Sequence, residues 1–238
     1  IVKTLFDPAC GTAGFLVDCD TGFGRTGVQS PEEAADLAEH VDQLPGLEFA
    51  GLMTHPILPG SGAWLDEARR WIEERGLVVR VISGGGTPGV FSAHESGVFT
   101  ELRLGTYVYG DRRLVALGQM ALDDCALRIV ATVVSRPASD RAILDAGSKT
   151  LTSDRPDGIR DEAFGHIVEY PDANLVRLSE EHGTLDLTNC GHRPALGERV
   201  TIVPNHACGA VNLHDEVALH RGGKQIEICA ILARGRVR

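Results

Sequence analysis

A histidine and a cysteine two residues apart form the most informative pair of chemically active side chains in this sequence. His206 and Cys208 follow an apolar run, so we expect them on a strand, where residues i and i+2 point to the same face. Imidazole and thiolate are both good ligands for zinc or a related metal, and two protein ligands leave positions open for water and substrate. The spacing therefore indicates a catalytic metal site. The alternative is a buried cysteine beside a hydrogen-bonded histidine, because free cysteine is among the most buried residue types.

The run Ser83–Pro88, with the sequence Ser-Gly-Gly-Gly-Thr-Pro, is a second candidate site. It follows a β-branched segment, and consecutive small residues after a strand can present several backbone N–H groups to an anion. The serine and threonine hydroxyl groups add further donors. The run predicts a phosphate-binding loop, and the alternative is a simple flexible turn.

The elements that must position these residues alternate between helix and strand. Ser30-Pro-Glu-Glu has the form of a helix start, with serine as the N-cap and proline at the first helical position. Apolar residues continue at near-helical spacing to Val41, and Pro45-Gly46 ends the helix. This alternation predicts βαβ units and a parallel sheet or barrel. The expected segments are strands at 1–6, 16–20, 47–53 and 77–82, a glycine-containing turn at 7–15, and helices at 30–44 and 63–75.

Three polar groups each follow one of the expected strands. They are Arg25, His55 and the run Ser83–Thr87. Ligands of α/β barrels bind at the carboxyl ends of the parallel strands. We therefore expect the three groups to lie on one rim of the sheet.

Composition limits the class of protein. The 238 residues are 43% hydrophobic and 24% charged, which is typical of a globular protein. A net charge of -10 argues against nucleic acid or an anionic membrane as the main partner. No apolar run approaches the ~20 residues that cross a bilayer. The six cysteines are scattered, which indicates reduced thiols and a cytoplasmic location.

The second half of the chain is β-rich. Short β-branched runs are separated by clusters of glycine, proline, asparagine and aspartate, which predicts strands joined by turns. The expected strands lie at 127–134, 166–169, 200–203 and 226–233.

Seven segments resemble the fold-type III pyridoxal-phosphate enzymes, the alanine racemase-like proteins. The first four come in the order seen in that family, and the last three are similar to the branch of D-threonine aldolase and D-serine dehydratase. The seven are Asp18–Val28, Gly51–His55, Ser83–Thr87, Thr100–Asp111, Asp145–Leu151, Leu178–Gly183 and Pro204–Cys208. The resemblance covers about residues 16–238. It implies a partial α/β barrel at 1–115 that binds pyridoxal phosphate, followed by a mainly β domain at 116–238 with a metal site.

The resemblance also implies roles for individual residues. Arg25 would contact the phenolic oxygen of the cofactor, and His55 would lie beside its pyridine ring. Arg103 stands where the racemases pair an arginine with the ring nitrogen, although the aldolase branch does not keep that residue reliably. The phosphate would be bound by Gly84, Gly85, Gly86 and Thr87, with Tyr109 as a further candidate.

The implied chemistry is that of a lyase acting on small D-β-hydroxy amino acids. Pyridoxal phosphate acts as an electron sink for charge at Cα. A zinc or manganese ion on His206 and Cys208 would polarise the β-hydroxyl group, promoting either its loss or cleavage of the Cα–Cβ bond. The His-x-Cys pair is closer to the dehydratase pattern, because D-threonine aldolase typically has aspartate at the second position. His182 would assist as a base or line the site, or is a surface histidine. The family members are homodimers.

One expected part is missing. The Schiff-base lysine of the family lies on the first barrel strand, well upstream of the segment that begins here at Asp18. Lys3 is too close to that segment to be this residue, and Lys149 lies in the β-rich part. We therefore predict a truncated or recombined lyase. The alternatives are a catalytically silent remnant that binds only metal or phosphate, and a fragment of a methyltransferase, because residues 5–16 resemble the S-adenosylmethionine-binding turn of adenine-specific DNA methyltransferases.

Overall fold

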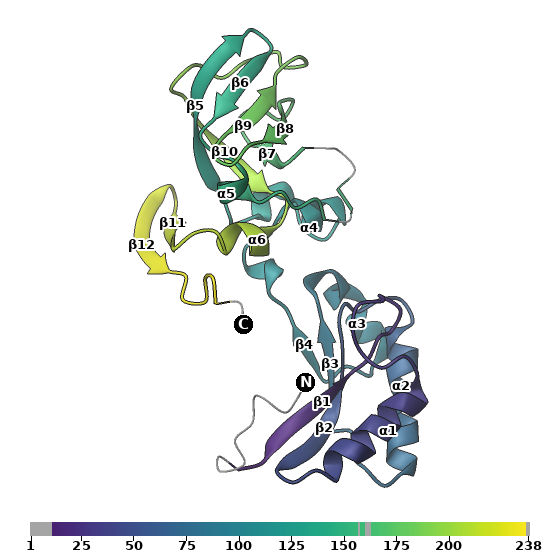
Figure 1. Cartoon of the computed structure of the whole chain (residues 1–238). Coiled ribbons are helices and arrows are strands. Elements are labelled where there is room, and N and C mark those ends of the chain that lie inside the picture. The colour runs from purple at the N-terminus through teal and green to yellow at the C-terminus, as the bar shows by residue number, and fades with distance from the viewer. Residues whose placement is uncertain (1–10, 157, 160–162, 237–238) are drawn as a thin grey trace. The chain divides into compact units, whose positions relative to one another are not determined.

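The computed structural model describes residues 11–156, 158–159 and 163–236 (Figure 1). The chain divides into two compact units, Ile1–Tyr107 and Val108–Arg238, each with its own hydrophobic core. The division comes earlier than the boundary at residue 115 that the sequence suggested. Asp111 and Arg112 explain this difference, because both side chains form hydrogen bonds within the second unit.

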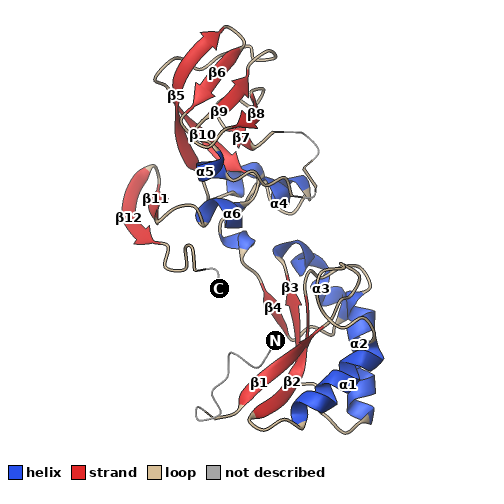
Figure 2. Cartoon of the chain, viewed as in Figure 1, coloured by secondary structure: helices blue, strands red, loops and turns tan. Residues whose placement is uncertain are grey.

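The first unit is a parallel sheet with strand order β1-β2-β3-β4. Figure 2 shows α1 and α2 against the same side of this sheet. The sheet confirms the expected α/β architecture. The elements are β1 (Ala13–Asp18), α1 (Pro31–Asp42), β2 (Leu47–Thr54), α2 (Ser61–Glu74), β3 (Val81–Gly85), η3 (Thr87–Gly89), α3 (Val90–Ser96) and β4 (Glu101–Arg103), and η4 (Thr106–Val108) spans the boundary to the second unit.

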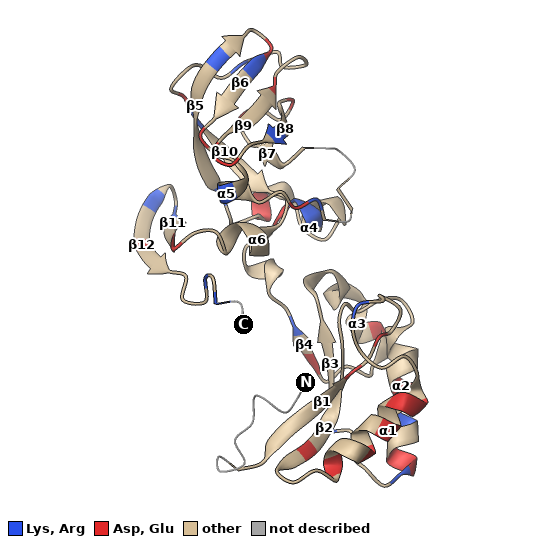
Figure 3. Cartoon of the chain, in the orientation of Figure 1, with Lys and Arg blue, Asp and Glu red and all other residues tan. Residues whose placement is uncertain are grey.

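Local sequence explains the start of α1. The Ser30 side chain accepts a hydrogen bond from the backbone N–H of Glu33, and Pro31 occupies the first helical position. Ala34 and Ala38 of this helix are fully buried in the core of the unit, together with Leu52 of β2. Asp and Glu residues recur along α1 and α2 (Figure 3), and nearly all of them are exposed. The amphipathic pattern read from the sequence is thereby confirmed.

Two expected boundaries in this unit are wrong. β3 begins at Val81 rather than Leu77, and it continues through Gly84 and Gly85, which were expected in a loop. Glycine is needed at this end of the strand because neighbouring side chains pack closely against it. An added Cβ on Gly84 would lie 2.5 Å from the Ile57 side chain. The expected turn at 7–15 is also shorter, since β1 already begins at Ala13. The earlier residues of that turn lie outside the described part of the chain.

The second unit is a closed antiparallel barrel with strand order β10-β5-β6-β9-β8-β7, followed by the β11–β12 hairpin (Figure 1). This architecture confirms the expected β domain. Its strands are β5 (Ile129–Ala138), β6 (Arg141–Leu144), β7 (Gly165–Ile167), β8 (Asn174–Leu178), β9 (Gly183–Asp186), β10 (Arg199–Pro204), β11 (Glu216–Arg221) and β12 (Lys224–Ala230). Its short helices are α4 (Arg112–Ala116), η5 (Leu122–Asp124), α5 (Ser148–Leu151) and α6 (Ala207–Val211). The sequence pattern missed β6, β8, β9 and β11, because they are short and carry polar or charged residues.

Two findings bear on the environment of the protein. The described cysteines, Cys19, Cys125, Cys190, Cys208 and Cys229, are all free thiols. Within the described ranges, no helix has both the length and the apolar character needed to cross a bilayer.

Asp111 connects two helix starts of the second unit. Its side chain is fully buried. One carboxylate oxygen accepts from the N–H of Leu114 in α4 at 3.0 Å, and the other accepts from Ala207 in α6 at 3.0 Å. The residue therefore fixes the segment that carries His206 against a helix from the start of the unit.

We expect Asp111→Ala to lower the free energy of unfolding of the second unit by roughly 2–3 kcal/mol, since it removes two helix caps and leaves buried N–H groups without acceptors. Urea unfolding followed by circular dichroism measures the change. Asp123→Ala, at an exposed position, is the matched control and should stay within about 0.5 kcal/mol of the wild type. Equal stability of the two variants would contradict the capping role.

Candidate active site

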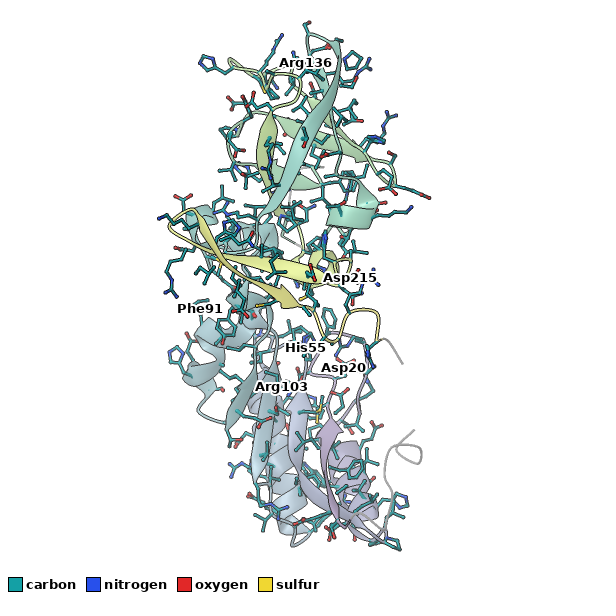
Figure 4. All side chains as sticks on the ribbon, turned by 90° about the vertical axis from the view of Figure 1, so that its left-hand side faces the viewer. Asp20, His55, Phe91, Arg103, Arg136 and Asp215 are labelled. Atoms are coloured by element: carbon teal, nitrogen blue, oxygen red, sulfur yellow. The ribbon has the colours of Figure 1, made fainter. Side chains whose placement is uncertain are left out.

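The carboxyl ends of β1, β2 and β3 meet at one edge of the sheet. The strands are parallel and in register, with Met53 opposite both Asp18 and Ser83. Figure 4 shows Asp20, His55 and Arg103 together at this end of the first unit. As expected, the structure places Arg25, His55 and the glycine run on one rim of the sheet.

The loop that carries Arg25 is organised by Asp20. The carboxylate of Asp20 accepts hydrogen bonds from the backbone N–H groups of Gly22, Phe23 and Gly24 at 2.9–3.0 Å. Those from Gly24 and Gly22 contribute most to lowering the pKa of Asp20. The loop closes tightly, because an added Cβ on Gly27 would lie 2.6 Å from the backbone nitrogen of Asp20. The exposed Arg25 side chain thus extends from a fixed loop.

His55 lies directly against the end of β3. An added Cβ on Gly85 would come within 2.5 Å of the His55 ring, so only glycine permits this contact. Burial, followed by the positive charges of Arg25 and Arg103, lowers the pKa of His55. Its Nδ1 atom is buried and has no hydrogen-bond partner among the described residues. A neutral imidazole at this edge can stack on or contact an aromatic ring.

Arg103 is held by the strand ends around it. It donates to the Ser83 hydroxyl at 2.5 Å and to the backbone carbonyl of Thr54 at 2.9 Å, while Ser83 donates to Glu101. Ser83 is fully buried in this network. The expectation that its hydroxyl group faces an anion is therefore wrong, because the hydroxyl is already used between Arg103 and Glu101.

Thr87 is the residue of the glycine run whose side chain remains open to a ligand, whereas the N–H of Gly86 is already used within the protein. The Thr87 hydroxyl is buried and has no hydrogen-bond partner among the described residues. Gly86 has a φ of 90°, which favours glycine, and its N–H donates to the carbonyl of Arg103 at 3.3 Å. An unpartnered buried hydroxyl group is a donor that an anionic group, such as the phosphate of pyridoxal phosphate, would satisfy.

Tyr109 belongs to the second unit. Its carbonyl accepts from the N–H groups of Ala126 and Leu127, at 2.6 and 2.9 Å, and its ring packs on the barrel core. Its suggested part in phosphate binding stays a prediction.

We expect Arg25→Gln to raise the pKa of His55 toward its usual value, because the substitution removes a positive charge that opposes protonation of the imidazole. A ¹H NMR titration of the His55 ring in the cofactor-free protein measures this shift. Arg70→Gln, on the exposed side of α2, is the control and should leave the titration unchanged. An unaltered His55 pKa in Arg25→Gln would show that the loop does not bring Arg25 to this edge.

The structure brings His206 and Cys208 together, but not on a strand. β10 ends at Pro204, His206 is the N-cap of α6, and Cys208 lies inside that helix. The expected strand spacing is wrong because the Asp111 carboxylate accepts the N–H of Ala207 and starts a helix there.

The two side chains are nevertheless hydrogen-bonded to each other. This bond, together with one to Asp154, outweighs burial and raises the pKa of His206 to about 9. The Nδ1 atom of His206 lies 2.7 Å from Asp154 Oδ2. Within the described part of the chain, no group of three or more His, Cys, Asp or Glu side chains has an arrangement that could hold a metal ion. His206 and Cys208 are thus the two side chains available as ligands, and a metal would have to displace a proton from the His206 ring.

His182 and Lys149 lie elsewhere in the second unit. His182 is exposed in the turn between β8 and β9, where its backbone bonds to Ser179. Lys149 forms ion pairs at 2.9 Å with Glu180 and Glu181, and these raise its pKa, so it is a poor nucleophile. The role of His182 as a base stays a prediction.

Sequence reasoning missed Asp20, Asp111 and Asp154. Asp20 has a local signal, because an aspartate followed by glycines is typical of a turn closed by a carboxylate. The other two act on residues 96 and 52 positions away. No local pattern indicates such pairs.

Comparisons with known proteins match both units. The family described as "Alanine racemase, N-terminal domain" matches residues 9–113, and the family described as "Putative serine dehydratase domain" matches residues 126–220. The chain is 32% identical to D-threonine aldolase of an Arthrobacter species over 238 residues. This alignment covers 92% of this chain and 60% of the aldolase.

Solved structures agree with these matches. D-threonine aldolase from Filomicrobium marinum is 30% identical, with a TM-score of 0.79 over 97% of this chain and 66% of that one. D-threo-3-hydroxyaspartate dehydratase from Delftia sp. HT23 is 25% identical, with a TM-score of 0.76 over 92% of this chain and 65% of that one. Two further solved structures are variants of a D-threo-3-hydroxyaspartate dehydratase. One variant replaces a histidine by alanine, and the other replaces a cysteine two positions later and is in the metal-free form.

The chain spans 60–66% of the length of these relatives. The predicted truncation and the methyltransferase alternative stay predictions. Both units, however, match the same group of enzymes in sequence and in architecture. The chain belongs to the alanine racemase-like family of fold-type III pyridoxal-phosphate enzymes, in the branch of D-threonine aldolase and D-serine dehydratase.

Proposed function

We propose that this chain is part of a pyridoxal-phosphate- and metal-dependent lyase acting on small D-β-hydroxy amino acids. The observation that carries the proposal is the edge of the first sheet, where His55 lies against Gly85 under the positive charges of Arg25 and Arg103, and where the buried Thr87 hydroxyl at the end of the glycine run has no partner. The His206 and Cys208 pair supports the metal-dependent part. The dehydratase and aldolase names of the relatives support the substrate class.

The residues of the first unit bind and orient the cofactor. Bound pyridoxal phosphate supplies an electron sink for negative charge at the substrate Cα. Thr87 would hold its phosphate beside Gly86, and Arg25 would bond to its phenolic oxygen. His55 would lie beside the ring as a neutral imidazole, because burial and the two arginines oppose its protonation.

The residues of the second unit hold the metal. His206 and Cys208 would bind a zinc or manganese ion, which would supply a Lewis acid for the substrate β-hydroxyl group. The histidine and cysteine replaced in the dehydratase variants have the same His-x-Cys spacing as His206 and Cys208. This similarity supports loss of the hydroxyl group over cleavage of the Cα–Cβ bond. We therefore favour a dehydratase over an aldolase.

A second candidate is a protein that binds the cofactor or a metal without catalysis. Of the three lysines in the sequence, Lys149 and Lys224 lie in the second unit, and Lys3 lies outside the described residues. Neither described lysine belongs to the unit that carries the candidate cofactor site.

Titration with pyridoxal phosphate, followed by borohydride reduction and peptide mass spectrometry, tests both candidates. The lyase proposal expects saturable binding that Thr87→Val weakens, and an adduct on one specific lysine would show that the predicted loss of the Schiff-base lysine is wrong. Saturable binding without any adduct supports the second candidate. A chain with no saturable binding would contradict the cofactor site itself.

A further inference from the structure

The His206 ring has a carboxylate partner in addition to Cys208. Asp154 Oδ2 lies 2.7 Å from His206 Nδ1, although the two residues are 52 positions apart in sequence. We propose that Asp154 is a positioning residue that holds the ring with Nδ1 directed toward the carboxylate, so that Nε2 is the atom offered to a metal. This inference rests on the proposed metal-dependent function and assigns a role to a residue outside the metal pair.

The turn that carries Asp154 has an unusual backbone. Thr152 has a φ of 65°, and it is the one non-glycine residue with a positive φ in the described ranges. Its hydroxyl accepts from the N–H of Asp154 at 3.0 Å, and its own N–H donates to the carbonyl of Ser148, the first residue of α5. With a ψ of 170° the residue lies in a region that is otherwise almost confined to glycine, and threonine persists there only where the surroundings impose it. The turn is therefore built to direct Asp154.

Gly209 makes room for this contact. An added Cβ at this position in α6 would lie 2.8 Å from Thr152 Cγ2 and 3.0 Å from Asp154 Oδ2. Alanine is favoured over glycine inside a helix, so helix stability does not explain the residue. From the other side, the amide of Asn205 donates to the carbonyl of Asp154 at 3.2 Å. The segment before His206 and the residue after Cys208 thus both fit the turn.

The chemical consequence follows from the two ring nitrogens. A neutral imidazole carries one N–H group, and donating it from Nδ1 to a carboxylate leaves the Nε2 lone pair free for a metal. The carboxylate also restricts rotation of the ring and makes the other nitrogen a stronger ligand. Removal of such a partner typically weakens metal binding by about 10–100-fold.

The test uses the full chain and three variants. Asp154→Ala removes the acceptor, Asp154→Asn keeps an oxygen that can accept from Nδ1–H, and Ser153→Ala changes the exposed neighbour as a matched control. Long-range ¹H–¹⁵N spectra of the metal-free chain report the His206 ring nitrogens, assigned by comparison with His206→Gln. Co²⁺ titration, followed by the sulfur-to-metal absorption band, gives the dissociation constant. Thermal unfolding shows whether each variant is folded.

We expect Asp154→Ala to shift the Nδ1 signal and to weaken Co²⁺ binding by about 10–100-fold. Asp154→Asn should lose less, and Ser153→Ala should match the wild type. Gly209→Ala should also weaken Co²⁺ binding, because its Cβ displaces the carboxylate.

Two outcomes separate this inference from the proposed function. Wild-type Co²⁺ affinity and an unchanged Nδ1 signal in a folded Asp154→Ala variant would overturn the positioning role, and the metal-dependent function would stand. A wild-type chain that binds no metal, but whose Nδ1 signal depends on Asp154, would contradict the metal-dependent function and support the positioning of the ring.

Discussion

His206→Ala and Cys208→Ala should each weaken binding of a divalent metal by more than about 100-fold, beyond the loss typical for a partner that only orients a ligand. Each substitution removes one of the two proposed ligands, and a single remaining side chain cannot hold the ion against water. Co²⁺ or Zn²⁺ titration of the purified chain measures the effect. In the lyase reaction, the same variants should lose activity that added metal does not restore.

Matched controls exist in the β11–β12 hairpin of the same unit. His220→Ala and Cys229→Ala change the same residue types away from the metal pair. Both should bind metal as the wild type does. Equal loss in the control and site variants would show that metal binds nonspecifically to surface histidines and thiols.

Gly51→Ala should lower the free energy of unfolding of the first unit by about 3 kcal/mol or more. An added Cβ would lie 1.9 Å from the carbonyl oxygen of Val81, which is the strand neighbour of Gly51 in β3. Backbone atoms of a paired strand cannot move aside without breaking the ladder. Urea unfolding measures the change, and cofactor binding at the strand ends should fall with it.

Gly14→Ala is the control for this substitution. Gly14 lies in β1, and an added Cβ would meet only the Ala50 side chain, at an ordinary 3.6 Å. It should leave stability within about 1 kcal/mol of the wild type. If Gly51→Ala were as stable as Gly14→Ala, the close packing of β2 against β3 would be wrong.

Much of the first unit could be predicted from local sequence. Ser30 and Pro31 specify a helix start, and the alternation of apolar and polar segments predicts the order of β1, α1, β2 and α2. The rim of Arg25 and His55 follows from that order, because parallel strands place their carboxyl ends together. The sequence placed the start of β3 too early. Residues 77–79 are apolar and largely β-branched like a strand, but the pairing of β3 with β2 begins only at Val81.

The second unit shows what the sequence determined and what the tertiary structure decided. The sequence determined the residue types of the proposed metal pair, the family and the β-rich character. The tertiary structure decided that Cys208 lies in a helix, that Asp111 caps it, and that Asp154 holds the His206 ring. These contacts join residues 52 and 96 positions apart. Local propensity and periodicity report only the neighbours along a helix or strand, so contacts of this range exist only once the barrel has closed.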